Sequence, residues 1–143
     1  MGYIEAIAIS RKKGVVKKET AEVKLVQDWG IEGDAHAGNW PRQVSLLAGE
    51  SIDRIKEKIP DLAIGAFAEN LVTRGIDLRL IKIRERLILA DNIILEVTQI
   101  GKECHSGCVI KEITGDCIMP REGIFAKVIS GGRLQTGDEI NLE

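Results

Sequence analysis

Aromatic residues are scarce in this 143-residue chain, at 3% of all positions. Hydrophobic residues still reach 44%, so the core must be built mainly from Ile, Leu, Val and Ala. No apolar run approaches the roughly 20 residues that a membrane-spanning helix needs. The first ten residues also lack a charged segment followed by an apolar one, the mark of a secretion signal. We therefore expect a folded cytoplasmic protein with no membrane partner.

A strong charge of either sign is absent too, because the formal net charge is −2. This balance argues against non-specific nucleic-acid binding, which needs a basic surface. One local run, Arg11 to Lys18 ("RKKGVVKK"), is basic and has Gly14 near its centre. We interpret it as a solvated hairpin turn, with a polyanion site as the alternative.

Cysteine is rare as well, and an odd count of three argues against a disulfide framework. Two cysteines and one histidine lie in "GKECHSGC" (101–108), as Cys104, His105 and Cys108, and Cys117 follows. A zinc site would need four ligands, but adjacent Cys and His rarely bind one ion and no CxxC pair is present. The alternatives are a regulatory Cys104–Cys108 disulfide, a thiolate nucleophile or soft-metal ligand whose pKa is lowered by His105 or Arg121, and a set of small buried hydrophobic residues.

Most of the chain reads as short strands rich in β-branched residues and bounded by Gly, Asn or Asp. They are expected at 3–10, 20–27, 42–48, 69–75, 86–90, 93–100 and 124–132, with a final turn and strand over 134–142. The first two would form a hairpin about Gly14, and Asp91-Asn92 would be a two-residue turn. The pattern predicts a mainly β fold in a single domain over 1–143: a closed or nearly closed β-barrel with one or two short helices.

One helix is expected in "AGESIDRIKEKI" (48–59), because Ile52, Ile55 and Ile59 share one face and Pro60 ends the segment. A second short helix is expected in "VIKEIT", directly after Cys108.

Two polar clusters are candidates for chemistry. The first is the glycine-rich loop "GIEGDAHAGNWPRQVS" (30–45), in which Asp34 and His36 could orient each other and Arg42 could bind an oxyanion or a phosphate. An ordinary loop with Asp34 capping its own backbone is the alternative. The second is Glu69-Asn70, for which a turn held by these two side chains is equally compatible with the sequence.

These segments together resemble the MOSC domain, named for the C-terminal domain of molybdenum cofactor sulfurases. The resemblance is carried by "GIEGDAHAG…RQVSLLAGESI", "FAENLVTRGIDL", "LEVTQIGKECHSGC" and "GDCIMPREGIFAKVISGGRLQTGDEI", in that order. It is strongest to the short, stand-alone bacterial proteins of this family. It implies a barrel of the MOSC, or PK-barrel-like, type and an association with the molybdenum cofactor, a pterin dithiolene that bears a phosphate.

The resemblance also assigns residues. Cys104 is the family's hallmark cysteine, proposed to carry a persulfide sulfur or to ligate molybdenum. The residues implied to line the cofactor cleft with it are Gly33, Asp34, His36, Arg42, Gln43, Ser45, Glu69 and Asn70, and Arg121 would add a second cation. This chain departs from the family at Arg84-Glu85, where a glycine is usual, so the turn there is expected to differ.

The function that follows is a molybdenum-cofactor-binding or sulfur-carrier protein. A PLP-dependent desulfurase domain has no room in the chain, so PLP is not expected to bind to it. The molybdopterin-type small molecule is the expected ligand, with a cysteine desulfurase, a molybdopterin-synthesis protein or a molybdoenzyme as partner proteins. The alternatives are a molybdenum-dependent reductase of N-hydroxylated compounds that uses an external electron donor, and a non-catalytic zinc-stabilised module.

Overall fold

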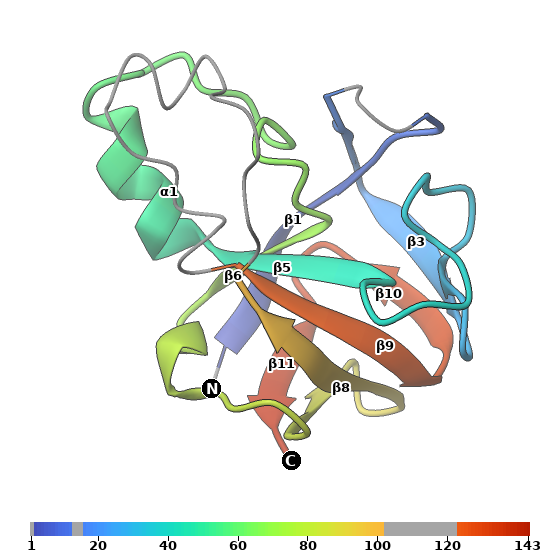
Figure 1. The fold of residues 1–143 in the computed structure, drawn as a ribbon. Helices are drawn as coiled ribbons and strands as arrows, with labels where there is room; N and C mark the ends of the chain where they lie inside the picture. The colour runs from blue at the N-terminus through green and yellow to red at the C-terminus, as the bar shows by residue number, and fades with distance from the viewer. Residues whose placement is uncertain (1, 13–15, 102–122) are drawn as a thin grey trace.

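The computed structural model describes residues 2–12, 16–101 and 123–143. Its elements are β1 (Gly2–Ile9), β2 (Lys18–Thr20), β3 (Glu22–Val26), β4 (Gly30–Ile31), β5 (Val44–Ala48), α1 (Gly49–Lys56), β6 (Leu71–Arg74), the 3-10 helix η1 (Leu78–Leu80), β7 (Arg86–Leu89), β8 (Ile93–Ile100), β9 (Ile124–Ser130), β10 (Gly132–Gln135) and β11 (Glu139–Leu142). Figure 1 shows the strands wrapped around a common interior with α1 to one side.

Seven strands of the described residues close into a barrel in the order β11-β7-β8-β9-β5-β6-β1, because β1 pairs with β11 as well as with β6. The short strand β2 adds to the free part of β1. The pairs around the ring are antiparallel except β5 and β6, which run parallel. A parallel pair needs a crossover connection, and α1 lies in it. The predicted mainly β, closed barrel with a short helix is confirmed.

The barrel interior is filled by residues that alternate along each strand with residues facing outward. On β8 the inward set is Ile93, Leu95 and Val97, all buried. On β5 Val44 and Leu46 point inward, whereas Leu47 belongs to a second cluster outside the barrel wall. The interior contains aliphatic side chains and no aromatic ring among the described residues, as the composition requires.

The second hydrophobic cluster joins α1 to the outside of the barrel. Its helix residues are Ile52 and Ile55, with Ile59 packed beside them, which confirms the predicted face. Arg74 on β6 strengthens the contact, because its guanidinium binds Glu5 of β1 through two hydrogen bonds of 2.8 and 2.9 Å and Asp53 of α1 at 2.7 Å. The helix ends at Lys56, three residues earlier than expected. The second expected helix lies outside the described residues.

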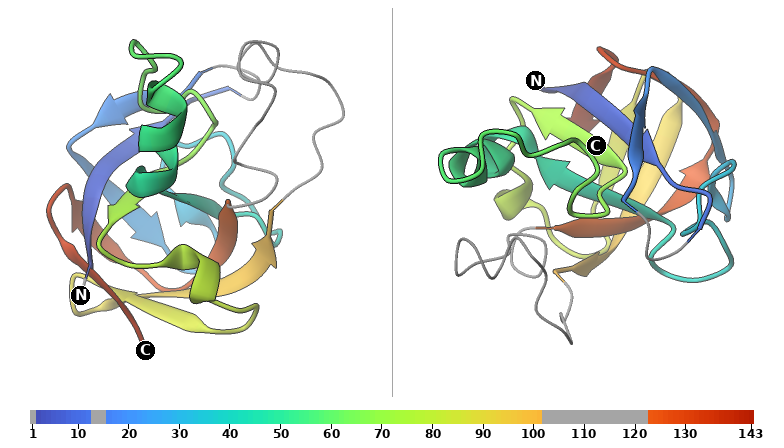
Figure 2. Two further views of the ribbon diagram at one scale, coloured as in Figure 1. Left: turned by 90° about the vertical axis from the view of Figure 1, so that its left-hand side faces the viewer. Right: turned by 90° about the horizontal axis from the view of Figure 1, so that it is seen from above.

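The strand predicted at 20–27 does not pair with β1 as expected. Only β2 continues the hairpin, and β3 leaves the barrel to form a separate three-stranded sheet in the order β10-β3-β4. The residues of β3 alternate buried and exposed, with Val23 and Leu25 in the main core. This alternation fits a strand with one face on the barrel, so it could not identify the partner strand. The two further views in Figure 2 show this sheet closing one side of the barrel.

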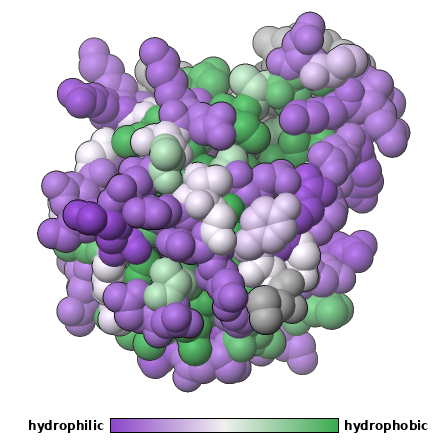
Figure 3. All heavy atoms as spheres, turned by 180° about the vertical axis from the view of Figure 1, so that it is seen from behind, coloured by the Kyte–Doolittle hydropathy of each residue, from purple (hydrophilic) through white to green (hydrophobic). Residues whose placement is uncertain are grey.

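The back of the molecule is largely covered by hydrophilic side chains, with smaller hydrophobic areas between them (Figure 3). None of the helices in the described part of the chain is long and apolar enough to cross a membrane.

Candidate functional site

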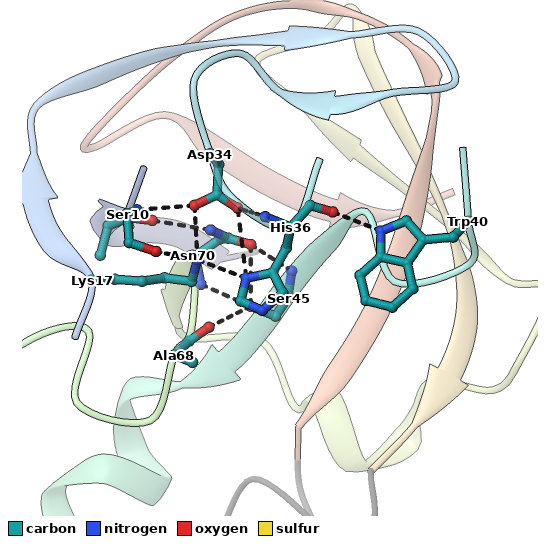
Figure 4. A network of polar contacts seen from close by, with 9 residues as sticks. Ser10, Lys17, Asp34, His36, Trp40, Ser45, Ala68 and Asn70 are labelled. Carbon is teal, nitrogen blue, oxygen red and sulfur yellow. Dashed lines mark hydrogen bonds and ion pairs between the residues drawn. The ribbon is translucent and has the colours of Figure 1, made fainter. Parts of the chain in front are cut away.

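The loop between β4 and β5 carries Asp34 and His36, and it is fastened to the end of β1 by hydrogen bonds (Figure 4). The backbone N–H of Ser10 donates to Asp34 Oδ1 at 3.0 Å, and the N–H of Ala35 donates to the Ser10 carbonyl at 2.6 Å. The N–H of His36 donates to Asp34 Oδ2 at 3.1 Å. Asp34 thus caps the backbone of its own loop and also lies beside His36. The sequence analysis had given these two roles as alternatives.

Lys17 is the residue of this site that the sequence analysis missed. The run Arg11 to Lys18 was interpreted as a solvated turn, and for Lys17 that is wrong because its side chain is fully buried. Its Nζ lies 2.7 Å from Asp34 Oδ1, 2.8 Å from His36 Nδ1 and 3.3 Å from Ser10 Oγ. An ammonium group has three N–H donors. Lys17 therefore has one acceptor for each of them.

The backbone of Lys17 is covered by the loop that precedes β6. A Cβ placed on Gly65 would lie 2.1 Å from the Lys17 carbonyl oxygen, so the two backbones are in direct contact. Gly65 has φ +91°, which favours glycine. This contact is part of the packing around Lys17, whose side chain is fully buried. In the sequence, Gly65 is visible as a glycine shortly before the "ENL" motif, but no pattern relates Gly65 to Lys17.

Glu69 closes the same loop. Its carboxylate is fully buried and accepts the N–H of Gly65 at 2.9 Å and that of Phe67 at 3.0 Å. Burial raises the pKa of Glu69 above its ordinary value, although these N–H groups and the nearby Lys17 charge act in the opposite direction. Glu69 thus holds the loop that covers the backbone of Lys17, and its described side-chain hydrogen bonds go to that loop and not to the other predicted site residues.

The raised pKa predicts a pH dependence of stability. A carboxyl group whose pKa is higher in the folded than in the unfolded state favours folding most when it is protonated. The free energy of unfolding of the natural protein minus that of Glu69→Gln should therefore fall as the pH rises from the ordinary carboxyl pKa through the raised one. Urea unfolding at a series of pH values measures this difference. Glu32→Gln, at an exposed position, is the control, and a difference that grows with pH would contradict the assignment.

His36, Trp40 and Arg42 form a stacked series along the same loop. The rings of His36 and Trp40 are 6.4 Å apart and nearly parallel, and Trp40 Nε1 donates to the His36 carbonyl at 2.7 Å. The Arg42 guanidinium lies 4.8 Å from the Trp40 ring centre and 5.9 Å from that of Phe125 on β9. Aromatic faces hold a guanidinium in place without using its N–H donors. Among the described residues Arg42 forms no ion pair, so those donors remain suited to an oxyanion.

Three predicted site residues form hydrogen bonds that join segments of the barrel. Gln43 is buried and joins two segments, since its Oε1 accepts the Val128 N–H at 2.9 Å and its Nε2 donates to Asp28 at 3.4 Å. Ser45 and Asn70 lock β5 to β6 through hydrogen bonds of 2.9 to 3.2 Å. Gly33 lies in the site loop with φ +85°, and nothing approaches its Cβ position within 4 Å.

Five residues singled out in the sequence lie outside the described residues: Cys104, His105, Cys108, Cys117 and Arg121. The points where their segment joins the barrel are described: the N–H of Gly101 donates to the Gly123 carbonyl at 2.6 Å. Directly beyond Gly123, the strand β9 includes Phe125, the ring that Arg42 approaches. The cysteine segment therefore joins the barrel beside Arg42. Within residues 2–12, 16–101 and 123–143, no group of three His, Cys, Asp or Glu side chains could hold a metal ion.

The fold and site define a class of protein: a closed, mixed β-barrel with a buried lysine–aspartate pair, a histidine oriented by it and a stacked arginine at one part of the wall. Within that class, residues 33–141 match the MOSC domain family, and the chain belongs to this family. A comparison with functionally curated proteins gave no significant match.

Three solved structures are similar to the chain in fold. The YUAD protein from Bacillus subtilis superimposes with a TM-score of 0.79 at 24% identity, over 98% of this chain and 94% of that one. YiiM from Geobacillus stearothermophilus gives 0.72 at 16% identity, over 100% and 75% of the two chains. YiiM from Escherichia coli gives 0.68 at 18% identity, over 100% and 70%. At these identities the likeness concerns the barrel and not the chemistry.

Proposed function

We propose that this protein binds the molybdenum cofactor beside Arg42 and His36, with Cys104 as its molybdenum ligand or as a persulfide sulfur carrier. One observation of the structure supports it above the others: a guanidinium held by two aromatic rings, without a carboxylate partner among the described residues, on a domain of the MOSC family. That family is generally linked to this cofactor.

The described residues fit such a ligand chemically. The cofactor is anionic through its phosphate, and a rigid guanidinium with its donors directed along its edge suits a phosphate or an oxo group. His36 adds a polar group on the same loop. The Lys17–Asp34 ion pair holds that loop in place, and both of its side chains are fully buried. Four further predicted residues would affect the ligand indirectly, because their side chains hydrogen-bond to the backbone around the site: Gln43, Ser45, Glu69 and Asn70.

Cys104 follows closely in sequence on a residue at this part of the barrel. It follows Gly101 by three residues, and three residues span at most about 11 Å of extended chain. Gly101 itself is hydrogen-bonded to Gly123, next to β9 and Phe125. A thiolate is the protein ligand that soft metals prefer, and it is also the group that carries a sulfur atom as a persulfide. Both assignments use the same thiolate.

When bound, the cofactor would supply a redox-active metal centre able to exchange oxo or sulfur ligands. The chain's own residues would hold the phosphate, orient the ligand and exclude water on one side. A sulfur-carrying role would need a cysteine desulfurase as donor, and a molybdopterin-synthesis protein or a molybdoenzyme as acceptor.

Cofactor loading tests the proposal. We expect protein purified from cells that make the cofactor to contain molybdenum and pterin, and Cys104→Ser to lose molybdenum. Arg42→Met should weaken retention roughly 10- to 100-fold, since a hydrogen bond to a charged group contributes about 1.5–3 kcal/mol. Arg133→Met, an exposed arginine on the separate sheet, is the matched control and should load like the natural protein. The measurement is elemental analysis for molybdenum with fluorescence of the oxidised pterin.

Each contrary result has a definite meaning. Negligible molybdenum and pterin in all four proteins would reject cofactor binding. Equal loading of the natural protein and Cys104→Ser would reject the role of Cys104 as ligand. About one zinc per chain, with unfolding on chelation, would support the zinc-stabilised alternative. Release of thiocyanate on cyanide treatment, absent in Cys104→Ser, would assign a persulfide and not a metal to this cysteine.

A further inference from the structure

The contact between Lys17 and His36 determines where the proton of the imidazole sits. Lys17 Nζ lies 2.8 Å from His36 Nδ1, which is a hydrogen-bond distance. An ammonium group donates and cannot accept. Nδ1 must therefore be the acceptor and carry no proton, and the neutral ring then bears its proton on Nε2.

The charge of Lys17 is secured by its other contacts. Asp34 Oδ1 lies 2.7 Å away, and both side chains are fully buried. A carboxylate at this distance favours the charged form of the amine, and a buried neutral lysine would leave that carboxylate without a counter-charge. Ser10 Oγ, at 3.3 Å, takes the remaining N–H. The arrangement opposes the reverse assignment, a neutral amine beside an imidazolium.

Without Lys17, Asp34 would favour the other neutral tautomer of His36, with the proton on Nδ1. Its Oδ2 lies 3.9 Å from His36 Nδ1, and a negative charge at that distance favours a proton on Nδ1. The position of Lys17 between the two, visible in Figure 4, reverses that preference.

We propose that Lys17 is a positioning residue that holds His36 as the neutral tautomer protonated on Nε2, so that His36 offers the bound ligand a hydrogen-bond donor and not a metal-coordinating lone pair. The ligand group recognised is accordingly an acceptor, such as a phosphate or oxo oxygen. The tautomer follows from the contacts alone; the identity of the ligand rests on the proposed function.

Nitrogen NMR tests the tautomer directly. Protein labelled with ¹⁵N in histidine has two imidazole rings, and His36→Gln identifies the signals of His36 by their loss. At neutral pH we expect a pyridine-type signal for Nδ1 and a pyrrole-type signal for Nε2. In Lys17→Met the two should exchange character or become those of an imidazolium. Lys18→Met, the neighbouring exposed lysine, should leave both unchanged.

The natural protein alone can overturn the proposal, by showing a protonated Nδ1, so a Lys17→Met protein that fails to fold does not prevent the test. The double variant Lys17→Met/Asp34→Asn, which removes both buried charges, should lose the preference for Nε2. A folded Lys17→Met protein with an unchanged tautomer would also reject the role of Lys17.

The donor role has its own test in the loading experiment, with the cofactor-producing cells as the source of ligand. The side-chain amide nitrogen of glutamine can replace an Nε2 donor, whereas that of asparagine falls short of it. His36→Gln should retain loading within about twofold and His36→Asn should lose roughly 2- to 10-fold, the effect of one hydrogen bond. Equal loss in both would reject the donor role. An absence of cofactor in the natural protein with the expected tautomer would reject the proposed function and leave the tautomer assignment standing.

Discussion

Replacing Lys17 with methionine should lower the free energy of unfolding by about 3–5 kcal/mol, the usual effect of removing one partner of a buried ion pair. The substitution keeps the length of the apolar stem but leaves the Asp34 carboxylate buried without a counter-charge. Ser10 Oγ and His36 Nδ1 lose a donor at the same time. Urea unfolding should show a lower midpoint with an unchanged slope, because the folded barrel itself is not altered.

Lys18→Met is the matched control for this measurement. It changes the same residue type one position further on, where the side chain is exposed, and should change stability by no more than about 0.5 kcal/mol. Adding Asp34→Asn to Lys17→Met should recover part of the loss, since the uncompensated charge is then gone. A Lys17→Met protein as stable as its Lys18→Met control would show that the buried pair does not stabilise this fold.

The second large effect is expected at Gly65, where alanine meets two separate obstacles. The φ of +91° disfavours any residue with a Cβ, at a cost of about 1–2 kcal/mol. The added atom would also lie 2.1 Å from the Lys17 carbonyl oxygen, a backbone atom that cannot move without shifting the start of β2. We expect the total loss to exceed the conformational cost clearly, by roughly 1–3 kcal/mol, as for other overpacked positions.

Gly137→Ala separates the two causes. Gly137 has φ +97°, but nothing lies within 4 Å of its Cβ position, so alanine there should show the conformational cost alone. Thermal or urea unfolding of both variants gives the comparison. Equal losses at the two glycines would mean that the contact between Gly65 and Lys17 is not tightly packed. In Gly65→Ala the imidazole signals of His36 should also shift, because Lys17 is displaced.

The barrel was predictable because its strands are rich in β-branched residues and are bounded by Gly, Asn or Asp, and in β8 burial also alternates along the strand. In β8 and β9 the inward positions are Ile or Val with few exceptions, and their ends coincide with Gly or Asn. The helix was equally clear from Ile52, Ile55 and Pro60. The sequence did not show which strands pair with each other, since an alternating pattern identifies the buried face of a strand but not its partner strand. For that reason the sequence could not show that β3 would pair with β10.

The site was predictable only where a motif joined its members. Asp34, His36 and Arg42 lie within nine positions of one loop, and the structure does bring them together with Trp40. Lys17 was missed because lysine in a basic run is normally solvated, and here it is buried against residues distant in the sequence, among them Asp34, His36 and Gly65. A ligand-lining role was implied by the family resemblance alone for Gln43, Ser45 and Asn70, and the structure shows them hydrogen-bonded to the backbone. The role of Cys104 stays a prediction.

The departure at Arg84-Glu85 has a structural counterpart. Arg84 adopts φ +79°, the left-handed conformation that a glycine accepts without strain. The turn thus keeps the backbone shape that glycine would allow, with a residue that is poorly suited to it. The sequence identified the position, and the expectation that the turn differs from that of other family members stays a prediction.

The hydrogen bond between Gly101 and Gly123 joins the two ends of the segment that holds the cysteines. The two residues lie side by side at the ends of β8 and β9, whose register is set by the strand pairs below them. Every cysteine of the chain lies in the segment between them. The described pairs between β8 and β9 end at Ile100 and Ile124, so none of them involves a cysteine. The residues that set this register and the cysteines thus occupy separate stretches of the sequence.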